Sequence, residues 1–346
     1  MLGNSARSRQ ISWLRVATVA VLIGIAAASV VVPGQVRATA DFVIWSLIVV
    51  APLVVPGIIL AAWVSASGAS DRIAEVFNGH LWHAVILASL IGALTPVCGV
   101  TVLPLMASLL ASGVPLAPVM AFWLSSPITD PAMLATTAAT LGFSFAIGKT
   151  LAAFGLGIIG GFATAGLEGR SWIRQPLRNN RFVGELGRQT CCGSDRFAAA
   201  IRRIPERRKR FLVDAKATTR LILICLVPAF AAEYWLNEAL QPEALSAYVG
   251  ERAWCAVPLA VFVGAPAYLD GYAALPLTRG LIDHGMSHGA AMAFLVSGGV
   301  VSIWGAMAIF PVLKSKPFLF YLGLAVFGSM ISGWAFEAIA PTPHFR

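Results

Sequence analysis

The stretch from Leu94 to Pro131, LTPVCGVTVLPLMASLLASGVPLAPVMAFWLSSPITDP, decides how the rest of the chain is interpreted. It is apolar enough to lie in a bilayer, yet it contains Pro, Gly, Ser, Thr, Cys and Asp where an uninterrupted spanning helix has Leu or Val. Interrupted backbone at membrane depth must be covered by protein or line a watery cavity, and such interruptions often mark transport sites. We therefore expect a binding site within this stretch.

The pattern of this stretch returns in the second half of the chain, at one constant offset that aligns Gly99 with Gly271. The residues Gly99, Leu103, Pro104, Leu105, Leu109, Gly113, Met120, Ala121, Phe122 and Ser125 are identical to Gly271, Leu275, Pro276, Leu277, Leu281, Gly285, Met292, Ala293, Phe294 and Ser297. Two unrelated apolar helices would match Leu to Leu, but would rarely also align three Gly or Pro residues in step with a Met-Ala-Phe run. The match predicts an internal duplication, which is common in secondary transporters. Residues paired by this alignment are called counterparts below.

The composition excludes an ordinary soluble protein. The mean hydropathy is +0.79, and 58% of the 346 residues are hydrophobic while 12% are charged. These values are typical of a polytopic protein of the lipid bilayer. The net charge of +9 falls mostly in one loop, where the positive-inside bias explains it without a nucleic-acid partner. The five cysteines are scattered and odd in number, so they predict no disulfide framework.

Four segments are predicted. They are an N-terminal helix at 1–40, a first transmembrane repeat at 41–167, a basic cytoplasmic linker at 168–216 and a second transmembrane repeat at 217–346. The apolar run at 16–32 could be the core of a cleaved signal peptide, but its length favours a retained signal anchor.

Within the repeats, two long apolar stretches contain breaks. The expected segments are Phe42–Ser65, broken Leu81–Ser112, interrupted Leu116–Leu141, Phe143–Leu167, Thr218–Leu240, broken Ala253–Ile282, Gly289–Leu313 and Phe318–Ala338. Each half of the first broken stretch reaches only about 20 Å as a helix, short of the roughly 30 Å hydrocarbon core. A broken stretch is therefore either one long tilted, kinked helix or a re-entrant hairpin.

The distribution of charge favours hairpins. If both broken stretches enter and leave on one side, the N-terminal arginines, the basic linker, Lys314 and Lys316 all lie in the cytoplasm, and Lys149 is the one basic residue left on the wrong side. The two halves then run in opposite directions. The predicted fold class is an all-α polytopic membrane protein with two inverted repeats, each with a re-entrant or broken helix, plus one extra N-terminal helix.

The candidate site residues lie at the breaks. A carboxylate at membrane depth is costly unless it is paired or solvated, which favours a functional Asp270, the repeat equivalent of Cys98. Asp130 could bind solute together with its hydroxyl neighbours or simply cap a helix. The predicted substrate-binding residues are Cys98, Gly99, Pro104, Ser125, Ser126, Thr129, Asp130, Asp270, Gly271 and Pro276.

Other motifs give weaker indications of a function. Arg279 and Asp283 are four residues apart and are expected to form an ion pair on a helix face. His284 and His288 have the same spacing, but two imidazoles without a third ligand are a weak metal signal. The chain has no P-loop and no protease or hydrolase signature. We therefore predict no enzymatic activity, no cofactor and no metal.

Three motifs resemble a known family. The runs CGVTVLPL at 98–105, GVPLAPVMAFWLSSPITDP at 113–131 and GYAALPLTRGLIDHGMSHGAAMAF at 271–294 are similar to the predicted permeases that include bacterial organoarsenical efflux permeases. The resemblance covers roughly 42–338, with the basic linker least alike. It implies a multi-pass protein of the bacterial inner membrane that transports without an ATPase, with some members exporting trivalent organoarsenicals.

Two departures from the family pattern concern the substrate. Members often carry Cys-x-Cys-Gly at the first break, where this chain has Pro96 before the lone Cys98. The family's Ser-Pro-x-x-Asn-Pro ends here in Asp130-Pro131, with a charge in place of an amide. One thiol fewer weakens binding of arsenic by three thiolates, while the added carboxylate favours a cation or a proton-linked solute.

The predicted function is that of an inner-membrane permease that exports a small solute, such as a trivalent organoarsenical, in exchange for protons. Two alternatives stay open, namely a channel and a non-transporting membrane subunit or assembly factor. The sequence is equally compatible with a monomer and a homo-oligomer.

Overall fold

The computed structural model describes residues 33–67, 80–95, 106–107, 109–110, 113–178, 204–239, 255–264, 271–301, 306, 309–310 and 312–339. These residues are almost entirely helical, and their β structure is limited to an isolated antiparallel bridge between Leu177 and Leu313. The helices are α2 (Pro33–Ser67), α4 (Leu81–Leu94), α6 (Leu116–Ser125), α7 (Pro131–Thr140), α8 (Phe143–Ala165), α9 (Ser171–Arg174), α11 (Pro205–Ala239), α13 (Ala256–Gly264), α14 (Gly271–Asp283), α15 (His288–Val300) and α17 (Ser315–Ile339).

The chain divides into two compact units, Met1–Val49 and Val50–Arg346. In the first unit, the structure describes the beginning of α2. The second unit contains the rest of α2 and all the other helices named above. The packing described below lies within the second unit.

Three of the described helices are long and apolar enough to cross a membrane. They are α8, α17 and the part of α2 from Gly34 to Pro52. Helices α8 and α17 have 23 and 25 residues, which corresponds to about 35 Å or more and exceeds the roughly 30 Å hydrocarbon core. Both also expose large apolar side chains, including Phe143 at 73% and Phe327 at 68%. Such exposure is expected of a face that contacts lipid.

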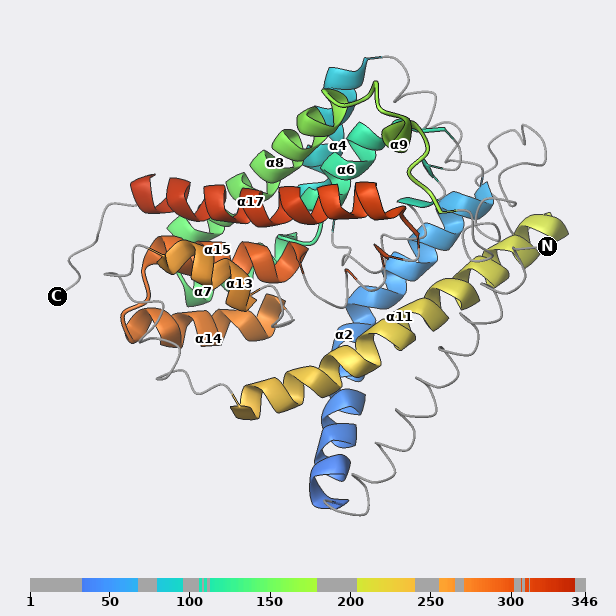
Figure 1. Ribbon diagram of the computed structural model, residues 1–346. Helices are drawn as coiled ribbons and strands as arrows, with labels where there is room; N and C mark the ends of the chain where they lie inside the picture. Colours follow the sequence, from blue (N-terminus) through green and yellow to red (C-terminus); the bar gives the residue numbers. More distant parts are fainter. Residues whose placement is uncertain are drawn as a thin grey trace, which may run out of the picture. The chain divides into compact units, whose positions relative to one another are not determined.

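Helices α4, α6 and α8 pack into one group, which Figure 1 shows side by side. Their close approach depends on residues without large side chains. A Cβ atom placed on Gly161 would overlap Val85 and lie 2.9 Å from Ala121 Cβ. Val85 and Ala121 are fully buried in the cluster that joins α4 to α6. Small residues let helices pack this closely in membranes.

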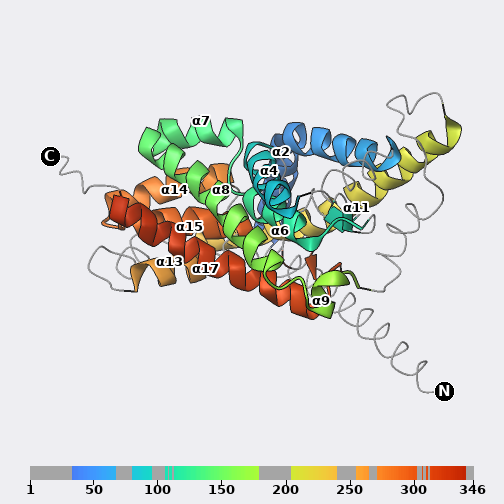
Figure 2. The same cartoon turned by 90° about the horizontal axis from the view of Figure 1, so that it is seen from above.

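Helices α13, α15 and α17 form a second group, which lies together in Figures 1 and 2. Its contacts repeat those of the first group at counterpart residues. A Cβ atom placed on Gly333 would lie 2.8 Å from Ala293 Cβ and 2.9 Å from Val257 Cγ1. These three residues are the counterparts of Gly161, Ala121 and Val85. The helix pairs within the groups also match, because Gly92 meets Ser125 and Phe122 where Gly264 meets Ser297 and Phe294.

The turns before α6 and α15 are the same as well. Gly113 and Gly285 have φ angles of 89° and 98°, a backbone region that glycine adopts without steric cost. The amide after each glycine donates to a carbonyl five residues earlier, Val114 to Leu109 at 3.0 Å and Met286 to Leu281 at 2.9 Å. This is the bonding of a glycine-terminated helix end. Substitution of either glycine would therefore strain the turn.

The two groups touch at positions that are equivalent to each other. A Cβ atom on Gly328 of α17 would overlap Leu156 of α8, which is its counterpart in the first half. A Cβ atom on Gly299 of α15 would lie 2.8 Å from the carbonyl oxygen of Pro127, again its counterpart. Helix α8 packs against both α15 and α17. Both Leu156 and Pro127 thus contact the residue that occupies their own position in the other half.

Several predicted segment boundaries match the helices. Helix α4 ends at Leu94, where the first break was predicted, and the interruption between 125 and 131 separates α6 from α7. Three boundaries were wrong. Helix α2 begins at Pro33 instead of Phe42. Helix α11 begins at Pro205 instead of Thr218, because Pro suits a first helical position and the Glu, Arg and Lys residues that follow are good helix formers. Helix α15 ends at Val300, after Gly298 and Gly299, and its 13 residues reach only about 20 Å.

Candidate functional site

The predicted site residues of the two broken stretches, 81–112 and 253–282, are only partly described. Cys98, Gly99, Pro104 and Asp270 lie outside the described residues. Gly271 is the first residue of α14, and Pro276 lies within the same helix with its ring exposed. The part that the structure places in full is the connection between α6 and α7, residues 126–130, which we call the α6–α7 break.

Ser125 ends α6 directly before this break and is fully buried. Its hydroxyl donates to the carbonyl oxygens of Ala121 at 2.9 Å and Phe122 at 3.1 Å, within its own helix. Gly92 of α4 and Gly157 of α8 pack against it. In this structure the side chain of Ser125 therefore fills the junction of three helices.

Two polar groups at or next to the break are buried without a hydrogen-bond partner in the described part of the chain. Ser126 is 3% exposed and Trp123, one turn earlier, is 0% exposed. Neither Ser126 Oγ nor Trp123 Nε1 has a hydrogen-bond partner among the residues that the structure describes. Leaving a buried polar group unpaired costs roughly 1–3 kcal/mol, so such groups call for an explanation. The indole N–H can only donate and the hydroxyl can donate or accept, so both could bind an acceptor on a solute.

Asp130 closes the break by capping α7. Its Oδ1 accepts hydrogen bonds from the backbone amides of Ala132 and Met133, each at 2.9 Å, and Pro131 occupies the first helical position. Asp followed by Pro is a favoured way to begin a helix. The predicted role of Asp130 as a helix cap is thus confirmed for one of its two carboxylate oxygens. Thr129 beside it is 4% exposed. Roles for Asp130 and Thr129 in solute binding stay predictions.

Sequence reasoning missed Lys149 as a site residue. Lys149 lies in the second turn of α8, is 3% exposed and interacts electrostatically with Asp130. A charged side chain in a membrane-spanning helix is costly and usually functional. Lys149 is also the one ionisable residue of α8. The sequence alone shows that Lys149 is the single charge of this apolar segment, but the topology argument treats it only as an exception to the positive-inside bias.

The position of Lys149 in the second half is occupied by Tyr321. Tyr321 is 2% exposed, and its hydroxyl donates to the carbonyl oxygen of Val300 at 2.7 Å. Its ring lies 5.3 Å from that of Trp123, measured between centroids. Val300 is the last residue of α15, so this hydrogen bond holds Tyr321 beside the end of that helix.

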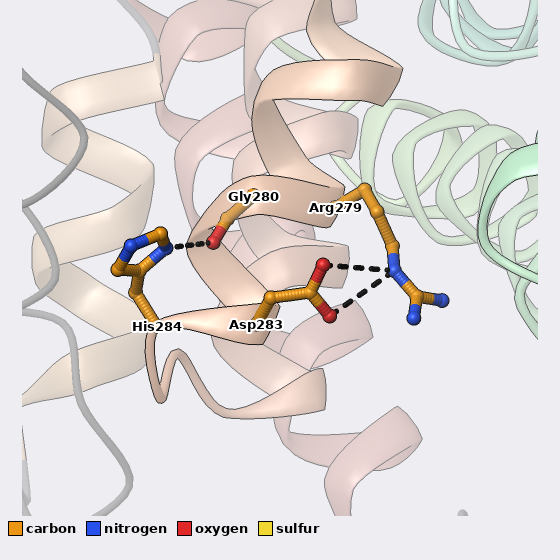
Figure 3. A network of polar contacts seen from close by, with 4 residues as sticks. All are labelled: Arg279, Gly280, Asp283 and His284. Carbon is orange, nitrogen blue, oxygen red and sulfur yellow. Dashed lines mark hydrogen bonds and ion pairs between the residues drawn. The ribbon is translucent and has the colours of Figure 1, made fainter.

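The polar residues near the end of α14 form a local network. Arg279 Nε lies 3.2 Å from each carboxylate oxygen of Asp283, and the side chains are 56% and 53% exposed. Figure 3 shows this pair and His284, whose Nδ1 lies 2.7 Å from the carbonyl oxygen of Gly280. The predicted i, i+4 ion pair is confirmed, and an exposed pair of this kind contributes little to stability.

The two histidines near this network are each engaged elsewhere. The ring of His288 lies 5.7 Å from that of Phe145, between centroids, while His284 is held by its own helix. Within the described ranges, no group of three His, Cys, Asp or Glu side chains could hold a metal ion.

Comparison with known proteins identifies a family that the chain matches. The family model described as "Predicted permease" matches residues 35–338. The UPF0718 protein MJ0584 of Methanocaldococcus jannaschii is 23% identical over 327 residues, covering 80% of this chain and 90% of that protein. The UPF0718 protein YcgR of Bacillus subtilis is 32% identical over 96 residues, covering 28% of this chain and 33% of that protein. No solved structure matches the chain.

Proposed function

The chain belongs to the predicted permease family, and from this premise we propose that it is a proton-coupled secondary transporter that exports a small solute across the bacterial inner membrane. The family and the apolar helices place it among integral membrane proteins of the transporter class. The observation that carries the finer proposal is the α6–α7 break. The Ser126 hydroxyl of this break and the Trp123 indole one turn earlier are both buried without a partner among the described residues, and the charge of Asp130 in the break acts on the buried Lys149.

The proposed mechanism uses the two halves as inverted repeats. Three observations support it: the matched helix contacts, the matched glycine turns, and the contacts of Leu156 with Gly328 and of Pro127 with Gly299. If a two-fold axis relates two halves, equivalent residues can meet only next to that axis. The axis would then pass by the α6–α7 break. Repeats arranged in this way commonly alternate the access to a site between them.

The solute would bind at the α6–α7 break through Ser126 Oγ and Trp123 Nε1, which gain the partners they lack. Trivalent organoarsenicals are the first compounds to test. The family resemblance suggests them, and the thiol of Cys98 is a suitable ligand for a soft element. The carboxylate of Asp130 in place of the family's amide is the feature that favours proton coupling.

The test is uptake into everted membrane vesicles across a panel of trivalent organoarsenicals and other small solutes. We expect one compound to accumulate only when a proton gradient is imposed, and an ionophore to abolish its accumulation. Ser126→Ala should raise the half-saturating concentration of that compound roughly 2- to 10-fold, the effect of losing one hydrogen bond. Ser329→Ala is the matched control, because Ser329 is equally buried but bonds the carbonyl oxygen of Ala325 in its own helix.

Two results would contradict the proposal. If well-folded protein moves no compound of the panel, a non-transporting membrane subunit becomes the better interpretation. If a compound equilibrates but never accumulates against its gradient, the protein is a channel.

A further inference from the structure

Lys149 is a buried cation whose charge the fold does not need. The α8 helix of the first half and the α17 helix of the second half pack in the same way, yet the second half holds a neutral tyrosine at the position of Lys149. The Tyr321 hydroxyl donates a hydrogen bond to the carbonyl oxygen of Val300. A neutral hydrogen-bond donor is therefore enough for the packing at this position. Burying the charge of Lys149 at membrane depth costs free energy, so its presence there indicates a role other than packing.

Asp130 is the countercharge of Lys149. Helix α8 packs against α4, α6, α7, α15 and α17. The ionisable residues of these helices, including the cap of α7, are His83, Asp130, His288, Lys316, Tyr321 and Glu337. Asp130 is the one whose charge acts on Lys149. His288 faces Phe145, and Glu337 accepts a hydrogen bond from the amide of Gly289.

The carboxylate of Asp130 is also held in place. Its Oδ1 is fixed by the amides of Ala132 and Met133 at the first turn of α7. A countercharge fixed in this way stays at the α6–α7 break. Lysine can lose its proton when its surroundings change, whereas arginine remains charged, so Lys149 is able to change its charge.

We propose that Lys149 carries the proton that drives transport, with Asp130 as its fixed countercharge. This inference rests on the proposed function and names the coupling group within the same site. With the site open to the cytoplasm, the ammonium gives one proton to water and keeps the nitrogen lone pair, and the solute binds at the α6–α7 break. With the site open outward, the solute leaves and Nζ takes one proton from water. One proton enters for each solute that leaves.

The experiment uses the full-length protein in proteoliposomes, with the transported compound of the vesicle panel as the probe. Two rates are measured, solute exchange at equal pH on both sides and accumulation driven by a pH gradient. We expect Lys149→Gln to keep exchange within about twofold of wild type. It should lose gradient-driven accumulation by roughly tenfold or more, the usual scale of coupling between two binding events. Lys149→Arg should lose accumulation as well, because arginine does not release its proton.

Two controls separate coupling from a structural role. Lys316→Gln removes an exposed lysine at the start of α17 and should change neither rate. The double variant Asp130→Asn/Lys149→Gln removes both charges, so a merely structural ion pair would predict full recovery of accumulation. We expect it to fold and to exchange solute as Lys149→Gln does, but not to accumulate it.

The outcomes are distinct. Gradient-driven accumulation that persists in Lys149→Gln, or returns in the double variant, would overturn the role of Lys149 and leave the transporter proposal intact. A wild-type protein that neither exchanges nor accumulates any solute would remove both proposals together.

Discussion

At the scale of single residues, glycines set the distance between α8 and its neighbours. Gly157 faces α4 and α6, and a Cβ atom placed on it would lie 2.8 Å from both Ala121 O and Ser89 Oγ. Gly155 lies two residues earlier in the same helix with open space around it. Lipid tails are as apolar as a helix surface, so close van der Waals packing carries much of the association between membrane helices.

We expect Gly157→Ala and Gly155→Ala to have opposite effects on stability. Gly157→Ala should destabilise the protein by about 1–3 kcal/mol, because the added methyl group overpacks the junction. Gly155→Ala should be neutral or stabilising by up to about 1 kcal/mol, since alanine suits a helix interior better than glycine. Thermal unfolding of detergent-purified protein measures the difference. Equal effects of the two substitutions would contradict this packing.

At the scale of the helices, the start of α7 is determined by Asp130 and Pro131. The cap fixes where the α6–α7 break ends, and it holds one carboxylate oxygen of Asp130 on the first backbone amides of α7. Helix α7 has only 10 residues and packs on α8 and α14. A helix this short is marginal without its cap and its tertiary contacts.

Replacement of Asp130 should separate capping from charge. Asp130→Ala should destabilise the protein by about 0.5–2 kcal/mol, while Asp130→Asn should cost much less, because asparagine caps helices as well as aspartate. Chemical denaturation in detergent, followed by tryptophan fluorescence, gives both values. If Asp130→Asn proved as damaging as Asp130→Ala, the charge and not the cap would hold α7.

At the scale of the whole molecule, the second unit contains two similar groups of three helices. Each group contains a short helix that ends inside the protein, α6 in one and α15 in the other, and a long helix that is able to span the membrane. The shared contacts follow one and the same alignment of the two halves throughout. A transporter with inverted repeats requires the two long helices to run in opposite directions across the membrane.

Labelling from each side of the membrane tests that direction. Ser144 and Lys316 are equivalent, exposed residues in the first turns of α8 and α17. In a cysteine-free background, Ser144→Cys should react with an impermeant maleimide from outside intact cells. Lys316→Cys should react only in everted vesicles. Reaction of both from the same side would exclude an inverted arrangement.

Much of the architecture followed from the order of residues. Apolar runs, Pro and Gly breaks, and the repeated motif predicted where α4 and α6 end and where α8 begins. These features are local, because hydrophobic length and helix breakers act within a few residues. Two of the wrong boundaries, at Pro205 and Val300, arose where charged helix formers or paired glycines acted against the hydrophobic pattern.

The site depended on contacts between distant segments. Residue order alone was enough to identify a membrane permease with a broken helix at Ser125–Pro131 and to offer a helix cap as one role for Asp130. Three-dimensional packing was needed to bury Lys149 and its counterpart Tyr321, and to leave Ser126 and Trp123 without partners among the described residues. Burial and pairing are properties of neighbours in space, and no periodicity along one helix specifies which side chains of another helix will face it.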